Sequence, residues 1–123
     1  MTRVLGIGVD LVSLSRMDKF AHDHRTRLDD LFTARERGRS SPDALACAWA
    51  IKESSLKSIG ALTGWEMDWT EIEAVKLTPK PEVRLTGRTA EVAAEKGIAV
   101  LECSLTSTPD FAMATAIALG EGT

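Results

Sequence analysis

Asp10 is the acidic residue of this 123-residue chain whose position is most informative, because it interrupts the apolar stretch "GIGVDLVSLSRM" at 6–17. The stretch begins as a strand, in which successive side chains point to opposite faces. Asp10 therefore shares one face with Gly6 and Gly8. The other face carries Leu5, Ile7, Val9 and Leu11. A carboxylate beside two residues without side chains predicts that a helix or a ligand approaches this face closely, and that another group balances the charge.

Glu53 is the second acidic residue of interest, and it lies in the clearest predicted helix, "SPDALACAWAIKESSLKSIG" at 41–60. At ~100° per residue, one side of this helix forms an apolar stripe. The stripe consists of Leu45, Trp49, Leu56 and Ile59. Lys52 falls in the middle of it, and Glu53 lies at its edge, one turn before Lys57. Because a buried lysine is costly unless it is paired, Lys52 either extends its amine to the surface or pairs with Asp10 in the core.

Asp10 and Glu53 together admit two interpretations. In the structural one, Glu53 and Lys57 form an ordinary surface pair four residues apart, and Asp10 serves the fold. In the functional one, the two carboxylates hold Mg²⁺ on a diphosphate. Mg²⁺ binds a couple of carboxylates, keeps several waters and takes its other ligands from phosphate oxygens, while Lys52 and Lys57 neutralise the same phosphates. The placement of Asp10 favours the functional interpretation.

The other residues capable of chemistry form no recognisable motif. The stretch "GIGVDL" has Leu11 where a dinucleotide-binding fingerprint has its third glycine. His22 and His24 lie at a charged helix end, where we expect both to be exposed. Cys47 and Cys103 lack metal-binding or redox spacing, so we expect reduced core cysteines in a cytosolic protein.

Helices and strands alternate along the chain and must position these residues. The expected elements are a strand at 3–12, a helix at 14–24 capped by Ser13, a capping box from Thr33 to Glu36, the helix at 41–60 capped by Ser41 and ended by Gly60, a loop at 61–68, a strand at 69–77, a short strand in "PKPEVRL", a helix in 86–97, and strands at 98–106 and 111–119. This order predicts one α+β domain over 1–123, with a small antiparallel sheet, a long central helix and flanking helices.

The last predicted strand has two different faces. Alanines alternate along one of them, and this thin face suits close packing by a helix or by a neighbouring subunit. The alanines are Ala112, Ala114, Ala116 and Ala118, and the larger residues opposite are Phe111, Met113, Thr115, Ile117 and Leu119.

Charge is distributed unevenly over a chain whose net charge is −3. Residues 16–39 carry seven Lys or Arg against five Asp or Glu, whereas the remaining positions carry eight against thirteen. The basic segment is either a solvated helical surface or a docking face for an acidic partner. The acidic balance and the absence of tyrosine argue against nucleic acid, and no apolar stretch approaches the ~20 residues of a membrane helix.

The chain resembles the holo-acyl-carrier-protein synthase family, the small 4′-phosphopantetheinyl transferases. The resemblance runs nearly from end to end, through "GIGVDLVSLSRM", "LFTARE", "AWAIKESSLKSIG", "EVRLTGRTAEVAAEKG" and "SLTSTPDFAMATAIAL". The first and third of these are similar to the family signatures G-x-D-[IL]-V-x-x-x-R and F-A-x-K-E-A-x-x-K-A-x-G.

The resemblance implies Mg²⁺-dependent transfer of phosphopantetheine from coenzyme A to a serine of an acidic acyl carrier protein, in fatty-acid or polyketide synthesis, with release of 3′,5′-ADP. By position, Asp10 and Glu53 are the metal ligands, and Glu53 and Lys57 are the catalytic residues. Arg16 matches the carrier-docking arginine of the family. Family members are commonly homotrimers with the site between protomers.

The same resemblance implies a set of residues that contact coenzyme A and its phosphates. This set is Lys52, Lys57, Gly60, Ser104 and Thr106.

The chain departs from the family pattern at three places. Ala48 stands where an arginine is usual, Pro79 stands in place of a glycine, and Ser107 replaces the histidine near the phosphates. These departures keep a second function open: a member of the same fold that binds carrier protein or CoA esters and has lost or changed the transfer chemistry. They also leave open whether water or Glu53 is the general base.

Overall fold

A computed structural model describes residues 1–60 and 66–121 of the chain. The elements are β1 (Thr2–Ser13), α1 (Leu14–Asp23), α2 (Leu28–Leu31), α3 (Ala34–Arg37), α4 (Ala44–Ile59), β2 (Ile72–Lys76), β3 (Glu82–Leu85), α5 (Gly87–Glu95), β4 (Ile98–Ser107) and β5 (Phe111–Glu121), with short 3₁₀ turns at Arg25–Arg27 and Trp69–Glu71. Most of the predicted loop at 61–68 lies outside the described residues. None of the described helices is long and apolar enough to cross a membrane.

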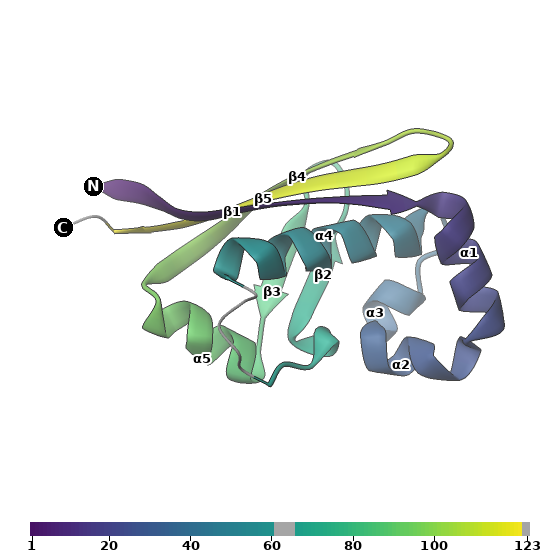
Figure 1. The fold of residues 1–123 in the computed structure, drawn as a ribbon, viewed down its shortest axis with the longest axis horizontal. Coiled ribbons are helices and arrows are strands. Elements are labelled where there is room, and N and C mark those ends of the chain that lie inside the picture. The colour runs from purple at the N-terminus through teal and green to yellow at the C-terminus, as the bar shows by residue number, and fades with distance from the viewer. Residues whose placement is uncertain (61–65, 122–123) are drawn as a thin grey trace.

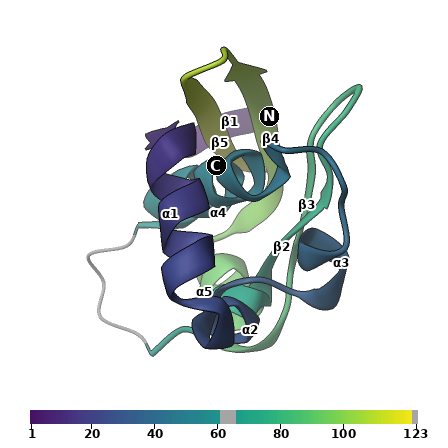
Figure 2. The same cartoon turned by 90° about the vertical axis from the view of Figure 1, so that its right-hand side faces the viewer.

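The strands form two antiparallel sheets, which confirms the predicted α+β class. One sheet is three-stranded in the order β1-β5-β4, and the other pairs β2 with β3. Helix α4 runs along the three-stranded sheet, and α2, α3, α5 and β2 lie on the other side of the helix (Figure 1). Seen end-on in Figure 2, α4 has the three-stranded sheet on one side and β2, β3 and α5 on the other. The core of the domain therefore surrounds α4.

Helix α4 is the element that approaches the glycine face of β1. A Cβ added to Gly8 would lie 2.0 Å from the carbonyl oxygen of Ser54, and one added to Gly6 would lie 1.9 Å from that of Ser58. Real Cβ atoms never approach backbone oxygens so closely, so any larger residue would push the helix off the strand. The glycines thus set the distance between α4 and β1.

The alanine face of β5 is covered by the same helix. Its four alanines are buried, which decides between the two predicted occupants of that face in favour of a helix. The opposite, outer face of the three-stranded sheet is apolar and exposed, and no described element covers it (Figure 1). Ile7 is 62% exposed, Val9 51% and Leu11 60%. We call this surface the outer face.

The residues that begin and end the helices discussed here are those predicted from the sequence, with one exception. The Ser13 side chain accepts from the backbone N–H of Arg16 and starts α1, and Gly60 ends α4 with a positive φ of 108°. The prediction that Ser41 caps the long helix is wrong. Helix α4 begins at Ala44 with Asp43 as its N-cap, because the Ser41 hydroxyl donates to the Asp43 carboxylate in a preceding turn.

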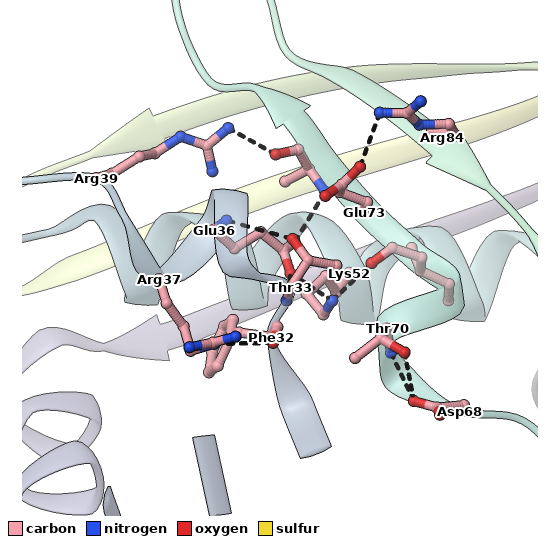
Figure 3. Close-up of polar contacts among 12 residues, drawn as sticks. Phe32, Thr33, Glu36, Arg37, Arg39, Lys52, Asp68, Thr70, Glu73 and Arg84 are labelled. Atoms are coloured by element: carbon pink, nitrogen blue, oxygen red, sulfur yellow. Dashed lines mark hydrogen bonds and ion pairs between the residues drawn. The ribbon is translucent and has the colours of Figure 1, made fainter. Parts of the chain in front are cut away.

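A buried ion pair joins three elements that are far apart in the sequence. Lys52 Nζ on α4 donates to Glu36 Oε1 at 2.9 Å and to the carbonyl oxygen of Ile72 at 2.6 Å. Glu36 also accepts from the backbone N–H groups of Thr33 and Ala74, both at 2.8 Å. Figure 3 shows Lys52 and Glu36 meeting beside β2. The predicted capping box from Thr33 to Glu36 is confirmed, and its glutamate also neutralises the buried lysine.

Candidate functional site

Asp10 on β1 and Lys57 on α4 form the central contact of the candidate site. Lys57 Nζ donates to Asp10 Oδ1 at 3.1 Å and to the carbonyl oxygen of Val9 at 3.0 Å. The Lys57 side chain is 50% exposed and that of Asp10 only 10%. The other oxygen, Asp10 Oδ2, is buried and has no hydrogen-bond donor within the described part of the chain. A nearly buried carboxylate therefore keeps one oxygen without a partner.

Glu53 interacts with Asp10 and has an unusual proton affinity. Burial raises the pKa of Glu53 from 4.5 to about 7, and the Asp10 carboxylate adds to the rise, while Lys57 and Trp49 partly oppose it. Two adjacent carboxylates disfavour ionisation of both at once. Near neutral pH and without a cation, burial and the neighbouring carboxylate therefore favour the protonated form of Glu53.

These two carboxylates line a pocket of about 500 Å³. Arg16 of α1 adds a cationic group to its wall, and Trp49 and Phe111 add apolar surface. Lys57 lies beside it through its contact with Asp10. We call this cavity the carboxylate pocket. It combines two potential metal ligands with two cations, a set suited to a multiply charged anion and its counter-ion.

The carboxylate pair fits a divalent cation that has few protein ligands. Lys57 supplies one positive charge to two adjacent carboxylates, and a cation at the oxygen of Asp10 that has no donor would supply the remaining charge. The described residues contain no cluster of three or more His, Cys, Asp or Glu side chains that could hold a metal. Mg²⁺ suits such a sparse site, because it keeps waters and binds phosphate oxygens.

Lys52 does not belong to this pocket, so the prediction that it lies beside the phosphates is wrong. Its side chain is fully buried and is paired with Glu36. Burial lowers the pKa of Lys52, and Glu36 partly opposes this effect. The prediction that Lys52 extends to the surface or pairs with Asp10 fails as well, because the partner is a glutamate on α3. The spacing within one helix could not identify a partner 16 residues away.

The predicted coenzyme A contacts on β4 lie on the other side of the sheet from Asp10. Ser104 pairs with Thr115 and Thr106 with Met113, and directly opposed residues of antiparallel strands share a face. Both therefore belong to the outer face, whereas Asp10 lies on the inner face against α4. Gly60 lies at the end of α4, where it stays a predicted contact.

A second hollow, of about 640 Å³, lies beside the first residues of α4. It is lined by Thr106 and Ser107, by Pro79, and by Arg39, which the sequence analysis had not singled out. Arg39 Nη2 donates to the carbonyl oxygen of Ala74 at 2.6 Å, while its Nη1 is buried with no partner among the described residues. We call this the arginine hollow. It shares no lining residue with the carboxylate pocket.

Two of the departures from the family pattern have clear places in the fold. Ser107 Oγ donates to Asp43 Oδ2 at 3.4 Å and so reaches the beginning of α4. Ala48 is fully buried. The only sequence signal for Arg39 was its place at the end of the basic segment 16–39.

Comparisons with known proteins find similarity along nearly the whole chain. Residues 6–116 match the sequence model of the 4′-phosphopantetheinyl transferase superfamily. The holo-[acyl-carrier-protein] synthase of Frankia casuarinae is 37% identical over 116 residues, which cover 94% of this chain and 97% of the relative. The acyl carrier protein synthase of Mycobacterium tuberculosis is 35% identical, with a TM-score of 0.70 over 98% of this chain and 100% of that chain. The holo-ACP-synthase of Plasmodium yoelii shares the fold, with a TM-score of 0.83, 24% identity and 99% coverage of both chains.

Lys52→Met and Lys57→Met are a matched pair that separates structural from functional lysines. Lys52→Met leaves Glu36 buried and unpaired, so we expect a loss of about 3–5 kcal/mol in unfolding free energy. Lys57→Met removes a half-exposed partner from Asp10, whose side chain is 10% exposed, and we expect a smaller loss of about 1–3 kcal/mol. Urea denaturation measures both. A Lys52→Met protein as stable as the wild type would contradict the buried pair.

The raised pKa of Glu53 predicts how stability changes with pH in the absence of metal. The folded chain holds a proton that the unfolded chain releases between pH 4.5 and about 7. This stabilising contribution is complete below pH 4.5 and is lost as the pH rises through about 7. In EDTA, the wild type should therefore lose more stability than Glu53→Gln between about pH 5 and about pH 8.

Thermal melts of the wild type, of Glu53→Gln and of the exposed control Glu91→Gln measure this effect. We expect Glu91→Gln to follow the wild type. Identical pH profiles for all three proteins would show that Glu53 titrates normally.

Proposed function

Since the chain belongs to the 4′-phosphopantetheinyl transferase superfamily, we propose that it is a holo-[acyl-carrier-protein] synthase whose site is centred on Asp10 and Glu53. In the proposed reaction, phosphopantetheine moves from coenzyme A to a serine hydroxyl of an acyl carrier protein, and 3′,5′-ADP leaves. The unpartnered oxygen of Asp10 beside Glu53 is the observation that carries this proposal. Most buried side-chain oxygens in proteins have a donor, so a buried carboxylate oxygen that has none favours a ligand at this place.

Asp10 and Glu53 would hold Mg²⁺, which when bound neutralises diphosphate charge and favours departure of the 3′,5′-ADP leaving group. Lys57 is the nearest cation to this pair, and its exposed half lets it turn toward the phosphates. There it would stabilise the negative charge that develops on the leaving group.

Proton removal from the attacking serine needs an acceptor, and the histidine of the family pattern is absent. A general base works best when its pKa lies near the working pH. The pKa of Glu53 lies near 7 only in the protein without metal, and a bound cation would lower it. In the loaded site Glu53 is ionised, so the acceptor is Glu53 itself or a water molecule beside it.

Arg16 lies at the edge of the carboxylate pocket and would contact the acidic carrier protein. It is exposed, and it is the first of the basic residues in the segment 16–39. Basic side chains around the pocket would attract an acidic protein and orient its serine toward the site.

We further propose a homotrimer in which two protomers complete each site. Within one protomer the sheet separates Asp10 from Ser104 and Thr106, so a single coenzyme A can contact both groups only if a second copy contributes one of them. The outer face offers the exposed apolar surface that such an assembly would bury. The arginine hollow of the neighbouring protomer would then receive the nucleotide end of coenzyme A.

We place the reaction in the cytoplasm, where Cys47 and Cys103 stay reduced, as both are free thiols here. Fatty-acid and polyketide carriers are equally compatible with the site.

A carrier-binding protein without transferase activity is the second candidate, favoured by Ser107 and Ala48 in place of polar family residues.

The transferase proposal predicts the effect of neutralising each carboxylate. We expect Asp10→Asn and Glu53→Gln to fold normally and to lose at least about 100-fold in transfer rate. The exposed control Asp18→Asn, on α1, should keep the wild-type rate. Intact-mass analysis of apo-carrier incubated with coenzyme A and Mg²⁺ measures the transfer. A carrier that never gains phosphopantetheine from the wild type would favour the binding protein, and full activity of Asp10→Asn would refute the metal site.

The trimer proposal predicts that a charge on the outer face disrupts assembly. We expect the wild type to have the solution mass of a trimer and Val9→Glu to dissociate and lose transfer, since a buried unpaired carboxylate is costly. Ala94→Glu on the exposed side of α5 is the control and should remain trimeric and active. Light scattering measures the mass. A wild type that is monomeric at working concentration, yet active, would contradict the shared site.

A further inference from the structure

Trp49 lies one turn before Glu53 on α4, and both side chains line the carboxylate pocket. Residues four apart on a helix are neighbours on its surface. A hydrogen bond from the Trp49 side chain opposes the rise in the pKa of Glu53, so the two side chains are in contact. The indole N–H is the only polar group of tryptophan, and it can only donate. Trp49 therefore donates its N–H to the carboxylate of Glu53.

The indole ring of Trp49 is held by two other aromatic rings. Its centroid lies 4.5 Å from that of Trp69 and 5.7 Å from that of Phe32. Phe32 is fully buried, and Trp69 begins the 3₁₀ turn Trp69–Glu71, which the Asp68 side chain caps. Both rings come from outside α4 and restrict the orientation of the indole, so its N–H points in a fixed direction.

The carboxyl group of Glu53 also contacts Asp10, so it interacts with an N–H donor and with a second carboxylate. The indole N–H takes one of the several acceptor sites of a carboxylate and leaves others for a cation. A glutamate side chain at a pocket wall can adopt several rotamers unless a partner selects one. Hydrogen bonds from neighbouring groups orient the ligands of metal ions in this way.

We propose that Trp49 is a positioning residue of the transfer reaction, whose indole N–H holds the Glu53 carboxylate in the orientation that binds a divalent cation together with Asp10. The proposal rests on the proposed transferase function. The family signature F-A-x-K-E has phenylalanine at the position of Trp49. An aromatic ring fills the core in either case, and only tryptophan adds a donor.

The alternative is that the contact serves only the fold, because a buried indole N–H usually needs a partner. Trp49→Phe separates the two roles, since phenylalanine keeps an aromatic ring in the cluster and has no N–H. Trp69→Phe is the matched control. It makes the same change in the neighbouring ring, which does not line the carboxylate pocket.

Nuclear magnetic resonance of the full chain in EDTA measures the contact without any reaction. The loss of one indole N–H signal in Trp49→Phe and of another in Trp69→Phe assigns the two signals. Glu53→Leu removes the acceptor, so we expect it to shift the Trp49 signal upfield and to leave the Trp69 signal in place. A Trp49 signal that does not respond to Glu53→Leu would overturn the proposal.

The Mg²⁺ dependence of transfer measures the positioning. We expect Trp49→Phe to need about tenfold more Mg²⁺ than the wild type for half-maximal transfer, with an unchanged KM for the carrier, since losing an outer hydrogen-bond donor costs about 10–100-fold in metal affinity or activity. Trp69→Phe should follow the wild type. An equal Mg²⁺ requirement in both variants would show that Trp49 serves only the fold.

Mn²⁺ binding separates this proposal from the transferase function. Electron paramagnetic resonance of free Mn²⁺, with protein but no carrier, gives the affinity of the wild type and of both phenylalanine variants. If the wild type never modifies a carrier, yet binds Mn²⁺ about tenfold more tightly than Trp49→Phe does, the transferase function fails and the positioning role stands. A wild type that does not bind Mn²⁺ would overturn the positioning role.

The wild type decides the matter if Trp49→Phe does not fold. Its Trp49 signal can be assigned from proton–proton contacts with neighbouring rings. We expect saturation with Mg²⁺ to shift this signal, because the N–H then donates to a metal-bound carboxylate, and to leave the Trp69 signal in place. A Trp49 signal that Mg²⁺ does not move would overturn the proposal.

Discussion

The close contact between α4 and the three-stranded sheet is the constraint on which the site depends. Gly6 and Gly8 of β1 let the backbone of α4 come within reach of the strand, and the alanines of β5 extend the same thin surface. At this distance, side chains of moderate length on α4 reach β1. Glu53 and Lys57 therefore meet Asp10 in one protomer, without a loop to carry them. Rigid elements of this kind hold charged groups more precisely than loops do.

The buried pair of Lys52 and Glu36 fixes the other side of α4. Burying two charges is favourable only when hydrogen bonds satisfy both, and here the backbone of α3 and β2 supplies them. The pair links α4 to two elements on the side away from the three-stranded sheet. Because Lys52 directly precedes Glu53, this link also restrains the rotation of α4 at the turn that carries Glu53.

The two faces of the three-stranded sheet carry different kinds of side chain. The inner face positions the acidic pair, and the outer face exposes apolar side chains together with Ser104 and Thr106. Small residues on one face and large ones on the other explain both properties, since the thin face admits a helix closely and the thick one stays exposed. An apolar cavity of about 280 Å³, lined by side chains of α1, α2 and α4 among others, lies beside the charged pocket.

The sequence by itself determined the α+β class, the strands, most helix ends and the role of Gly6 and Gly8. These follow from local periodicity and from capping chemistry, which act over a few residues. Only the tertiary structure decided the partner of Lys52, the start of α4 at Ala44, and the separation of Ser104 and Thr106 from Asp10. It also revealed Arg39 as a lining residue and placed Trp69 beside Trp49. Each of these depends on contacts between residues far apart in the chain, and spacing along one helix or strand carries no information about the element that packs against it.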